Sequence, residues 1–211
     1  MTGRPFETLT ALAAPLLRDN IDTDTIIPSR EIKSVGKHGL AQGLFAGWRY
    51  QGAGREPDPQ FILNQVRYAQ AQILLAGRNF GCGSSREHAV WALCEYGIRA
   101  IVAQSFAPIF FENCVNNGLL AAALPAAALH ALADAILAAP QLHPLTLDLQ
   151  HSELRTPSTG AIPFAIDPDA RERLLEGLDA IALTLKNIAD IDTFHGRDRR
   201  LRPWVYLRQC P

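Results

Sequence analysis

The sequence predicts an α/β fold arranged as a single domain over residues 1–211. Residues 72–76 form a short apolar run with the length of a buried strand. A turn rich in glycine follows this run, and a helical pattern comes directly after the turn. The order of strand and helix recurs at 98–103 and 107–117. Strands that alternate with helices in this way indicate a partly parallel sheet.

The elements before this central unit are predicted to be short. Residues 5–18 contain a first strand, and residues 20–28 a polar turn that runs into a short apolar strand ended by Pro28. Residues 29–60 are rich in Gly, Lys, Arg and Pro, and a connection of this length usually serves as a lid or binding loop. We expect this segment to be disordered without a partner, apart from a helix near 39–48.

The helix after the glycine turn is predicted over 84–96. Ser84 is followed three residues later by Glu87, which is the spacing of a capping box at a helix start. The free N–H groups of a first helical turn, with Arg86 beside them, favour a carboxylate or a phosphate. The sequence therefore predicts an anion-binding site that carries the hydroxyl groups of Ser84 and Ser85.

The second half of the chain predicts a helix followed by strands. An amphipathic helix is indicated by four apolar residues at helical spacing: Leu129, Leu132, Ile136 and Leu137. Residues 145–149 alternate like a half-buried strand, and residues 152–166 predict a hairpin with Gly160 at its turn.

The C-terminal region is predicted to end in a polar tail. Asp167 and Pro168 open a helix over about 169–179, and 180–185 predicts a last strand. The tail at 190–211 is polar and basic, but aspartates interrupt its arginines. We therefore expect a solvated or partner-wrapping end rather than a nucleic-acid-binding patch.

The composition excludes several classes of protein. Hydrophobic residues make up 48% of the chain and charged residues 19%, as in ordinary globular proteins. A net charge of -1 gives no reason to expect binding to nucleic acid or acidic lipid. Residues 1–10 lack the apolar core of a secretory signal, and Pro125 and Asp134 interrupt the alanine-rich run at 119–139. We expect a cytoplasmic protein that binds neither nucleic acid nor membranes.

The two serines after the glycine turn have a structural and a functional interpretation. An isolated Ser-Ser-Arg-Glu sequence would be a helix cap with a surface arginine. Here it follows a buried strand, where α/β proteins bind ligands, and this position favours function. The turn is not a nucleophile elbow, because Gly83 stands where that motif has its serine, and it lacks the Gly-Lys-Ser/Thr of a P-loop.

Asp22 and Asp24 are weaker candidates, because aspartates beside a short strand commonly make turn hydrogen bonds. Cys82 lies in the glycine turn, but the four cysteines form no CxxC pair. We therefore expect no metal site within this chain. His88 adjoins the serines, and most helical histidines of this kind pack or face solvent.

Together these motifs closely resemble the family of 3-isopropylmalate dehydratase small subunits, in the aconitase superfamily. The resemblance covers residues 5 to 188 and rests on five blocks: NIDTDTIIP (20–28), GLFAGWRY (43–50), GRNFGCGSSREHAVWAL (77–93), SFAPIFFENCVNNGLL (105–120) and GLDAIALTL (177–185). It implies the swivelling β/β/α domain that corresponds to the C-terminal domain of aconitase. It also implies a large partner subunit that carries a 4Fe-4S iron–sulfur cluster, with no cofactor bound by this chain.

The resemblance also implies roles for particular residues. Ser84 matches the serine whose alkoxide removes a proton next to a carboxylate of the substrate, a small 2-hydroxy dicarboxylic acid. Ser85 and Arg86 match residues that bind a substrate carboxylate, and Asp24 matches an aspartate that hydrogen-bonds and orients. Residues 29–45 match the loop that selects the side group of the substrate.

Three functions remain open at this point. The first is a small subunit that isomerises 2- and 3-isopropylmalate in leucine biosynthesis. The second is the small subunit of a related dehydratase acting on another substituted malate, of the citramalate or dimethylmalate type. The third is a carboxylate-binding regulatory module without catalysis. A self-sufficient serine hydrolase is less favoured, because no histidine has an evident position as a base for Ser84.

Overall fold

The computed structural model describes residues 5–33, 36–52, 54–157 and 160–206 of the chain. At its centre is a parallel sheet with the strand order β2 (Ala13–Leu16), β5 (Ile73–Ala76), β6 (Ala100–Ala103) and β7 (Leu120–Ala123). The strands predicted at 72–76 and 98–103 are confirmed as β5 and β6. The sequence analysis did not find β7, whose LAAA sequence has little strand propensity.

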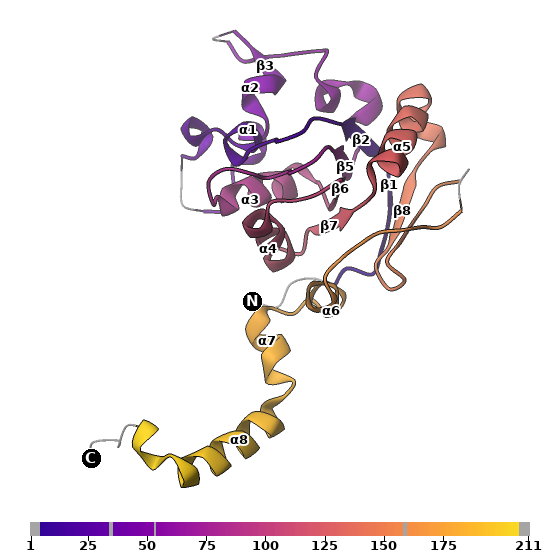
Figure 1. The fold of residues 1–211 in the computed structure, drawn as a ribbon. Helices are drawn as coiled ribbons and strands as arrows, with labels where there is room; N and C mark the ends of the chain where they lie inside the picture. Colours follow the sequence, from indigo (N-terminus) through magenta and orange to yellow (C-terminus); the bar gives the residue numbers. More distant parts are fainter. Residues whose placement is uncertain (1–4, 34–35, 53, 158–159, 207–211) are drawn as a thin grey trace.

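Helices cover the parallel sheet on both faces (Figure 1). The crossover helices α3 (Glu87–Tyr96) and α4 (Pro108–Asn116) lie on one face. The other face is covered by α5 (Ala126–Ala138), which contacts β2, and by a second sheet. The predicted stripe on α5 is confirmed for Leu129, Leu132 and Ile136, whereas Leu137 is exposed.

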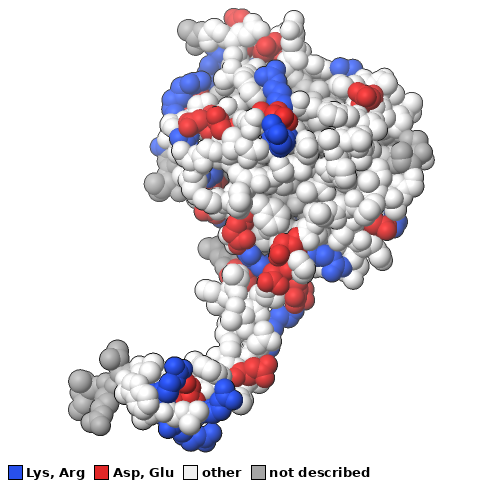
Figure 2. Space-filling model, viewed as in Figure 1, with Lys and Arg blue, Asp and Glu red and all other residues white. Residues whose placement is uncertain are grey.

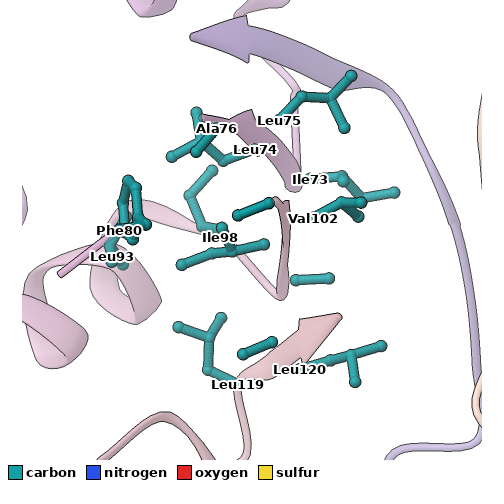
Figure 3. Packing of buried hydrophobic residues seen from close by; sticks show 14 of the residues in the cluster. Ile73, Leu74, Leu75, Ala76, Phe80, Leu93, Ile98, Val102, Leu119 and Leu120 are labelled. Carbon is teal, nitrogen blue, oxygen red and sulfur yellow. The ribbon is translucent and has the colours of Figure 1, made fainter. Parts of the chain in front are cut away.

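The core lies around β5 (Figure 3). All four residues of β5 are fully buried, since a parallel strand between covering layers has no solvent face. Phe80, from the turn after β5, and Leu93, from α3, pack on the same side of the sheet and are also fully buried. This packing fixes the strand-to-helix turn between β5 and α3.

The second sheet is antiparallel, with the order β1 (Thr8–Ala11), β8 (Leu145–Asp148), β9 (Glu153–Arg155) and β10 (Ile162–Pro163). The strand at 145–149 and the hairpin at 152–166 are thereby confirmed, although the residues before Gly160 at the predicted turn lie outside the described ranges. The single strand predicted at 5–18 is instead two strands, β1 and β2, in different sheets. Only Leu12 separates them.

The segment between β2 and β5 contains short helices, a hairpin and 3₁₀ turns. It contains α1 (Thr23–Ile26), α2 (Ala46–Arg49), the hairpin of β3 (Tyr50–Gln51) and β4 (Glu56–Pro57), and 3₁₀ turns at Ser29–Glu31, Ala41–Gly43, Ile62–Asn64 and Val66–Tyr68. The strand predicted within 20–28 is wrong, because the Asp22 carboxylate caps a helical turn there by accepting from the Thr25 N–H at 2.6 Å. The expectation of a disordered 29–60 segment is wrong for its described residues, although a helix near 39–48 is confirmed by α2.

Apolar side chains hold the described residues of the 29–60 segment in place; this segment is called the recognition loop below, after the role that the family resemblance implies. Leu40, Leu44 and Phe45 are buried, and Phe45 stacks on Trp48 with ring centroids 5.8 Å apart. The Arg18 guanidinium lies over the Trp48 ring, 4.5 Å from its centroid. The loop therefore adds to the core instead of extending into solvent.

The C-terminal region departs most from expectation. The helix predicted at 169–179 is confirmed as α6 (Pro168–Glu176), with the Asp167 carboxylate accepting from the Ala170 N–H at 3.0 Å. The strand predicted at 180–185 is wrong, because these residues form α7 (Ala180–Leu185), capped by Asp179 at the Ala182 N–H. Much of the predicted polar tail is helix α8 (Ile188–Leu201), and a 3₁₀ turn at Pro203–Val205 follows it.

Residues 180–206 form an arm that extends from α6 away from the two sheets (Figure 1). Acidic side chains gather where the arm leaves the body, and basic side chains lie at its far end (Figure 2). At its root, Lys186 donates to Glu172 at 2.5 Å and to Glu176 at 2.7 Å. In the part of the chain that is described, no helix is long and apolar enough to cross a membrane.

Candidate functional site

Three loops meet at the carboxyl edge of the parallel sheet, where β2, β5 and β6 end. The Asn20 N–H donates to the Arg78 carbonyl and the Gly81 N–H to the Ile21 carbonyl, each at 2.8 Å. These bonds tie the loop after β2 to the loop after β5. Because adjacent parallel strands end at the same edge, the aspartate and serine motifs become neighbours although they are far apart in sequence.

Glycines allow the turn after β5 to take its path. Gly81 has a φ of 76°, and a Cβ placed there would lie 2.1 Å from the Phe110 ring. Gly83 has a φ of 86°, in the left-handed region that favours glycine. The turn between them therefore passes close to α4 and presents Ser84 and Ser85 to solvent.

The helix after this turn begins later than predicted. Glu87 is the first residue of α3, and Arg86 is its N-cap without a side-chain capping bond. The capping box between Ser84 and Glu87 is therefore wrong. The Glu87 carboxylate instead accepts from the Asn117 side-chain amide at 2.8 Å, which joins the start of α3 to the end of α4. Ser84 lies in the turn ahead of the helix and is exposed.

The predicted site residues Asp24 and Arg86 are in direct contact. Arg86 Nη1 donates to Asp24 Oδ1, and the two side chains form an ion pair with exposed fractions of 20% for Arg86 and 55% for Asp24. Ser29 Oγ donates to the same carboxylate oxygen at 3.3 Å. The hydrogen bond from Arg86 is the main reason that the pKa of Asp24 lies below its usual value. The Asp24 carboxylate is therefore charged at neutral pH.

Asp22 and Asp24, which the sequence analysis considered together, have separate roles. Asp22 caps α1, whereas Asp24 holds Arg86. Thr23 lies between them and was not predicted as a site residue. Its side chain is buried, and its hydroxyl donates to the Ser84 carbonyl at 2.8 Å.

Three of the four predicted residues, Ser84, Ser85 and Arg86, line one cavity of about 180 Å³, whereas Asp24 is not among its lining residues. Ile109 and Asn113 of α4 also line this cavity. The cavity thus brings together two hydroxyls, a guanidinium, an apolar side chain and an amide side chain. It suits a small carboxylate with an apolar substituent.

The recognition loop is fastened to the helix that starts at this site. The Glu95 carboxylate, on the last turn of α3, accepts from three successive backbone N–H groups of the loop: Gly39 at 2.7 Å, Leu40 at 2.5 Å and Ala41 at 2.8 Å. These bonds, first that from Gly39, lower the pKa of Glu95. Glu95 could not be identified from the sequence, because its partners are 54 to 56 residues away.

Two of the described cysteines, Cys94 and Cys114, do not fit a metal or cluster site. Burial raises the pKa of Cys94 to about 11 and also raises the pKa of Cys114, so both thiols stay protonated, whereas cluster ligands are thiolates. Cys82 is half-buried in the glycine turn. Over the described ranges, no three His, Cys, Asp or Glu side chains are grouped so as to hold a metal ion. His88, beside the site, packs on the Trp91 ring at 4.8 Å.

Comparison with known proteins gives a consistent result. The family model of the aconitase C-terminal domain matches residues 4–127. The chain is 59% identical over 204 residues to a 3-isopropylmalate dehydratase small subunit from Cupriavidus necator, covering 96% of this chain and 98% of the relative. It is 46% identical over 210 residues to the small subunit from Magnetococcus marinus, with 96% and 98% covered.

A solved structure has a similar fold. It is the 3-isopropylmalate dehydratase (leuD) of Methanocaldococcus jannaschii, with 26% identity and a TM-score of 0.62. The match covers 88% of this chain and 99% of the archaeal chain.

Proposed function

This chain belongs to the aconitase C-terminal domain family, and from that membership we propose that it acts as the small subunit of a 3-isopropylmalate dehydratase. This hydro-lyase interconverts 2-isopropylmalate and 3-isopropylmalate by dehydration and rehydration in leucine biosynthesis. Curated relatives with this name match nearly the whole chain. Of the three functions that the sequence left open, the first is therefore supported.

The observation that carries the proposal is the placement of Ser84. Its side chain is exposed on the cavity, in a turn that also presents Arg86. A serine hydroxyl is a weak base at neutral pH, so its alkoxide needs nearby positive charge. Arg86 and the N-terminal N–H groups of the ten-residue helix α3 supply that charge. Ser84 is the residue that removes the proton next to a substrate carboxylate and later returns it.

Arg86 and Ser85 bind that carboxylate. Removal of the neighbouring proton moves negative charge onto the carboxylate oxygens, so a guanidinium in contact with them stabilises the transition state more than the ground state. Arg86 carries five N–H donors, and a bond to Asp24 leaves it capacity for a bidentate carboxylate. The Ser85 hydroxyl lines the same wall and adds a further donor.

Asp24 fixes the direction of Arg86. A long, flexible arginine side chain would otherwise lose conformational entropy each time it bound substrate. The ion pair with Asp24 holds the guanidinium in place before substrate arrives. Asp24 is thus an orienting residue of the site.

The partner is the large subunit of the enzyme. That subunit would hold the iron–sulfur cluster, which would supply a Lewis acid for the hydroxyl that leaves. The two subunits together enclose the substrate, and the complex is cytoplasmic. This chain supplies the proton transfer and the carboxylate binding.

The proposal is tested with the purified chain, the large subunit and an intact cluster. Wild-type complex should convert 2-isopropylmalate to 3-isopropylmalate. Ser84→Ala should assemble normally and lose about 10²- to 10⁴-fold in kcat, since a general base is removed. Near-normal turnover by Ser84→Ala would contradict the assignment of the base. Binding of the substrate by a wild-type complex with a verified cluster but without turnover would favour the regulatory function.

A further inference from the structure

We infer that Thr23 is a positioning residue for the reactive hydroxyl, acting through the backbone of Ser84; this inference rests on the function proposed above. Thr23 is the middle residue of the Asp22–Asp24 turn and follows the N-cap of α1. Its neighbours each hold one element: Asp22 caps the helix and Asp24 holds Arg86. Thr23 holds the segment from Cys82 to Ser84, called the serine turn below.

Two hydrogen bonds from Thr23 bracket the serine turn. The Thr23 N–H donates to the Cys82 carbonyl at 2.9 Å, and the Thr23 hydroxyl donates to the Ser84 carbonyl at 2.8 Å. Asp22 and Cys82 also form a parallel bridge, which places the two segments side by side. The three residues from Cys82 to Ser84 are therefore fastened at both ends to one residue of the other loop.

The residue between these two anchors explains why fastening is needed. Gly83 has a φ of 86° and has no Cβ to restrict it. A glycine gives its neighbours wide conformational freedom, so the direction of Ser84 depends on the hydrogen bonds on either side. Without the bond to its carbonyl, Ser84 could rotate about Gly83 and move its hydroxyl away from Arg86.

The surroundings of the Thr23 hydroxyl strengthen this bond. Thr23 is only 2% exposed, so water has little access to the donor side of this bond. Thr23 also lines the cavity beside Ser84. The hydroxyl is therefore placed to fix the geometry of the turn and does not itself need to touch the reacting atoms.

The expected effect is on turnover rather than on binding. A misplacement of a catalytic group by about 1 Å can lower a rate by about 100-fold. Loss of the Thr23 hydroxyl should therefore lower kcat by about 10- to 100-fold and change KM by less than about 3-fold. Substrate binding is spared because Arg86 is held by Asp24, a different residue.

The test uses the complex with the large subunit and compares variants that differ in the hydroxyl. Thr23→Val keeps the shape and removes the donor, whereas Thr23→Ser keeps the donor. Thr25→Val, in the same short helix, is the matched control and should leave kcat unchanged. We expect low kcat for Thr23→Val, near wild-type kcat for Thr23→Ser, and faster amide hydrogen exchange at 82–86 in Thr23→Val alone.

Several outcomes would overturn the inference. One is a Thr23→Val complex with kcat within 2-fold of wild type, and another is a Thr23→Ser complex as slow as Thr23→Val. Should Thr23→Val fail to fold, Thr23→Ala and Thr23→Ser decide, because they differ only in the hydroxyl; equal kcat in these two overturns the inference. Failure of the proposed function would look different, since the wild-type complex would then be inactive.

Discussion

Asp24 and Arg86 are 62 residues apart in the sequence, and their side chains form an ion pair whose arginine lines the same cavity as Ser84. The pair joins the loop after β2 to the start of α3. Neither residue could hold the other without the parallel pairing of β2 with β5, which brings the two loops to one edge. The sheet therefore determines the electrostatics of the site.

Asp24→Asn should lower the catalytic activity of the complex more than it lowers the assembly of the two subunits. The amide keeps the shape of Asp24 but removes the charge that holds the Arg86 guanidinium, so the guanidinium becomes mobile. We expect kcat/KM for 2-isopropylmalate to fall by about 10- to 100-fold. Ser29→Ala removes only the 3.3 Å hydrogen bond to the same carboxylate, so its kcat/KM should fall by less than about 3-fold. Equal losses in both variants would argue against the ion pair as the orienting contact.

The pH dependence of activity near neutral pH should not reflect the titration of Asp24. The Arg86 hydrogen bond lowers the pKa of Asp24 from its ordinary value of 3.8. A carboxyl with a lowered pKa contributes fully to the stability of the fold at pH values above its ordinary pKa. This contribution is lost as the pH falls through the lowered pKa. Asp24 therefore stays ionised throughout the range from about pH 5 to pH 8.

The pH prediction is checked by profiles of kcat/KM for wild type and Asp24→Asn. The two profiles should have the same shape between about pH 5 and pH 8 and differ by a constant factor. An acidic limb in this range that is present in wild type and absent from Asp24→Asn would show that Asp24 titrates there.

Glu95→Gln should loosen the recognition loop. A glutamine has one carbonyl acceptor and no charge, so it cannot satisfy the N–H groups of Gly39, Leu40 and Ala41 as the carboxylate does. We expect KM for 2-isopropylmalate to rise by about 3- to 10-fold, with a smaller change in kcat. Glu56→Gln is the matched control, because Glu56 lies exposed in strand β4 of the same loop. Faster hydrogen exchange at 39–41 should accompany the change in Glu95→Gln only.

Gly81→Ala should destabilise the fold. The new Cβ would meet the Phe110 ring, and a φ of 76° is unfavourable for alanine. Overpacking and the left-handed backbone together should lower the free energy of unfolding by about 2–4 kcal/mol, measured by urea denaturation. Gly47→Ala is the control: Gly47 lies in helix α2 and a Cβ there meets nothing within 4 Å, so stability should stay equal or rise by up to about 1 kcal/mol.

Much of the central unit could be predicted from the sequence because its signals are local. The apolar run of β5, the glycines after it and the apolar faces of α3 and α4 all lie within short windows. The four residues chosen for the site, Ser84, Ser85, Arg86 and Asp24, do lie near one another in the structure. Their chemical roles remain predictions.

The errors occurred where tertiary contacts outweigh local patterns. Ser84 and Glu87 have capping-box spacing, yet the bond from Thr23 holds the Ser84 carbonyl and the Asn117 amide holds Glu87. Thr23 and Glu95 had no local signal, because each acts on residues more than fifty positions away. Residues 180–185 contain β-branched side chains that suggest a strand, but the Asp179 cap favours a helix, and none of the described sheets includes these residues.

The projecting arm changes how the free chain would behave in solution. Helix α8 has 14 residues and so is about 21 Å long at roughly 1.5 Å per residue. It carries exposed apolar groups such as Phe194 and Leu201. A 23.1 kDa molecule with such a projecting arm diffuses and sediments more slowly than a sphere of equal mass. Gel filtration calibrated with compact standards would consequently overestimate its mass, and light scattering is needed to distinguish an elongated monomer from a dimer.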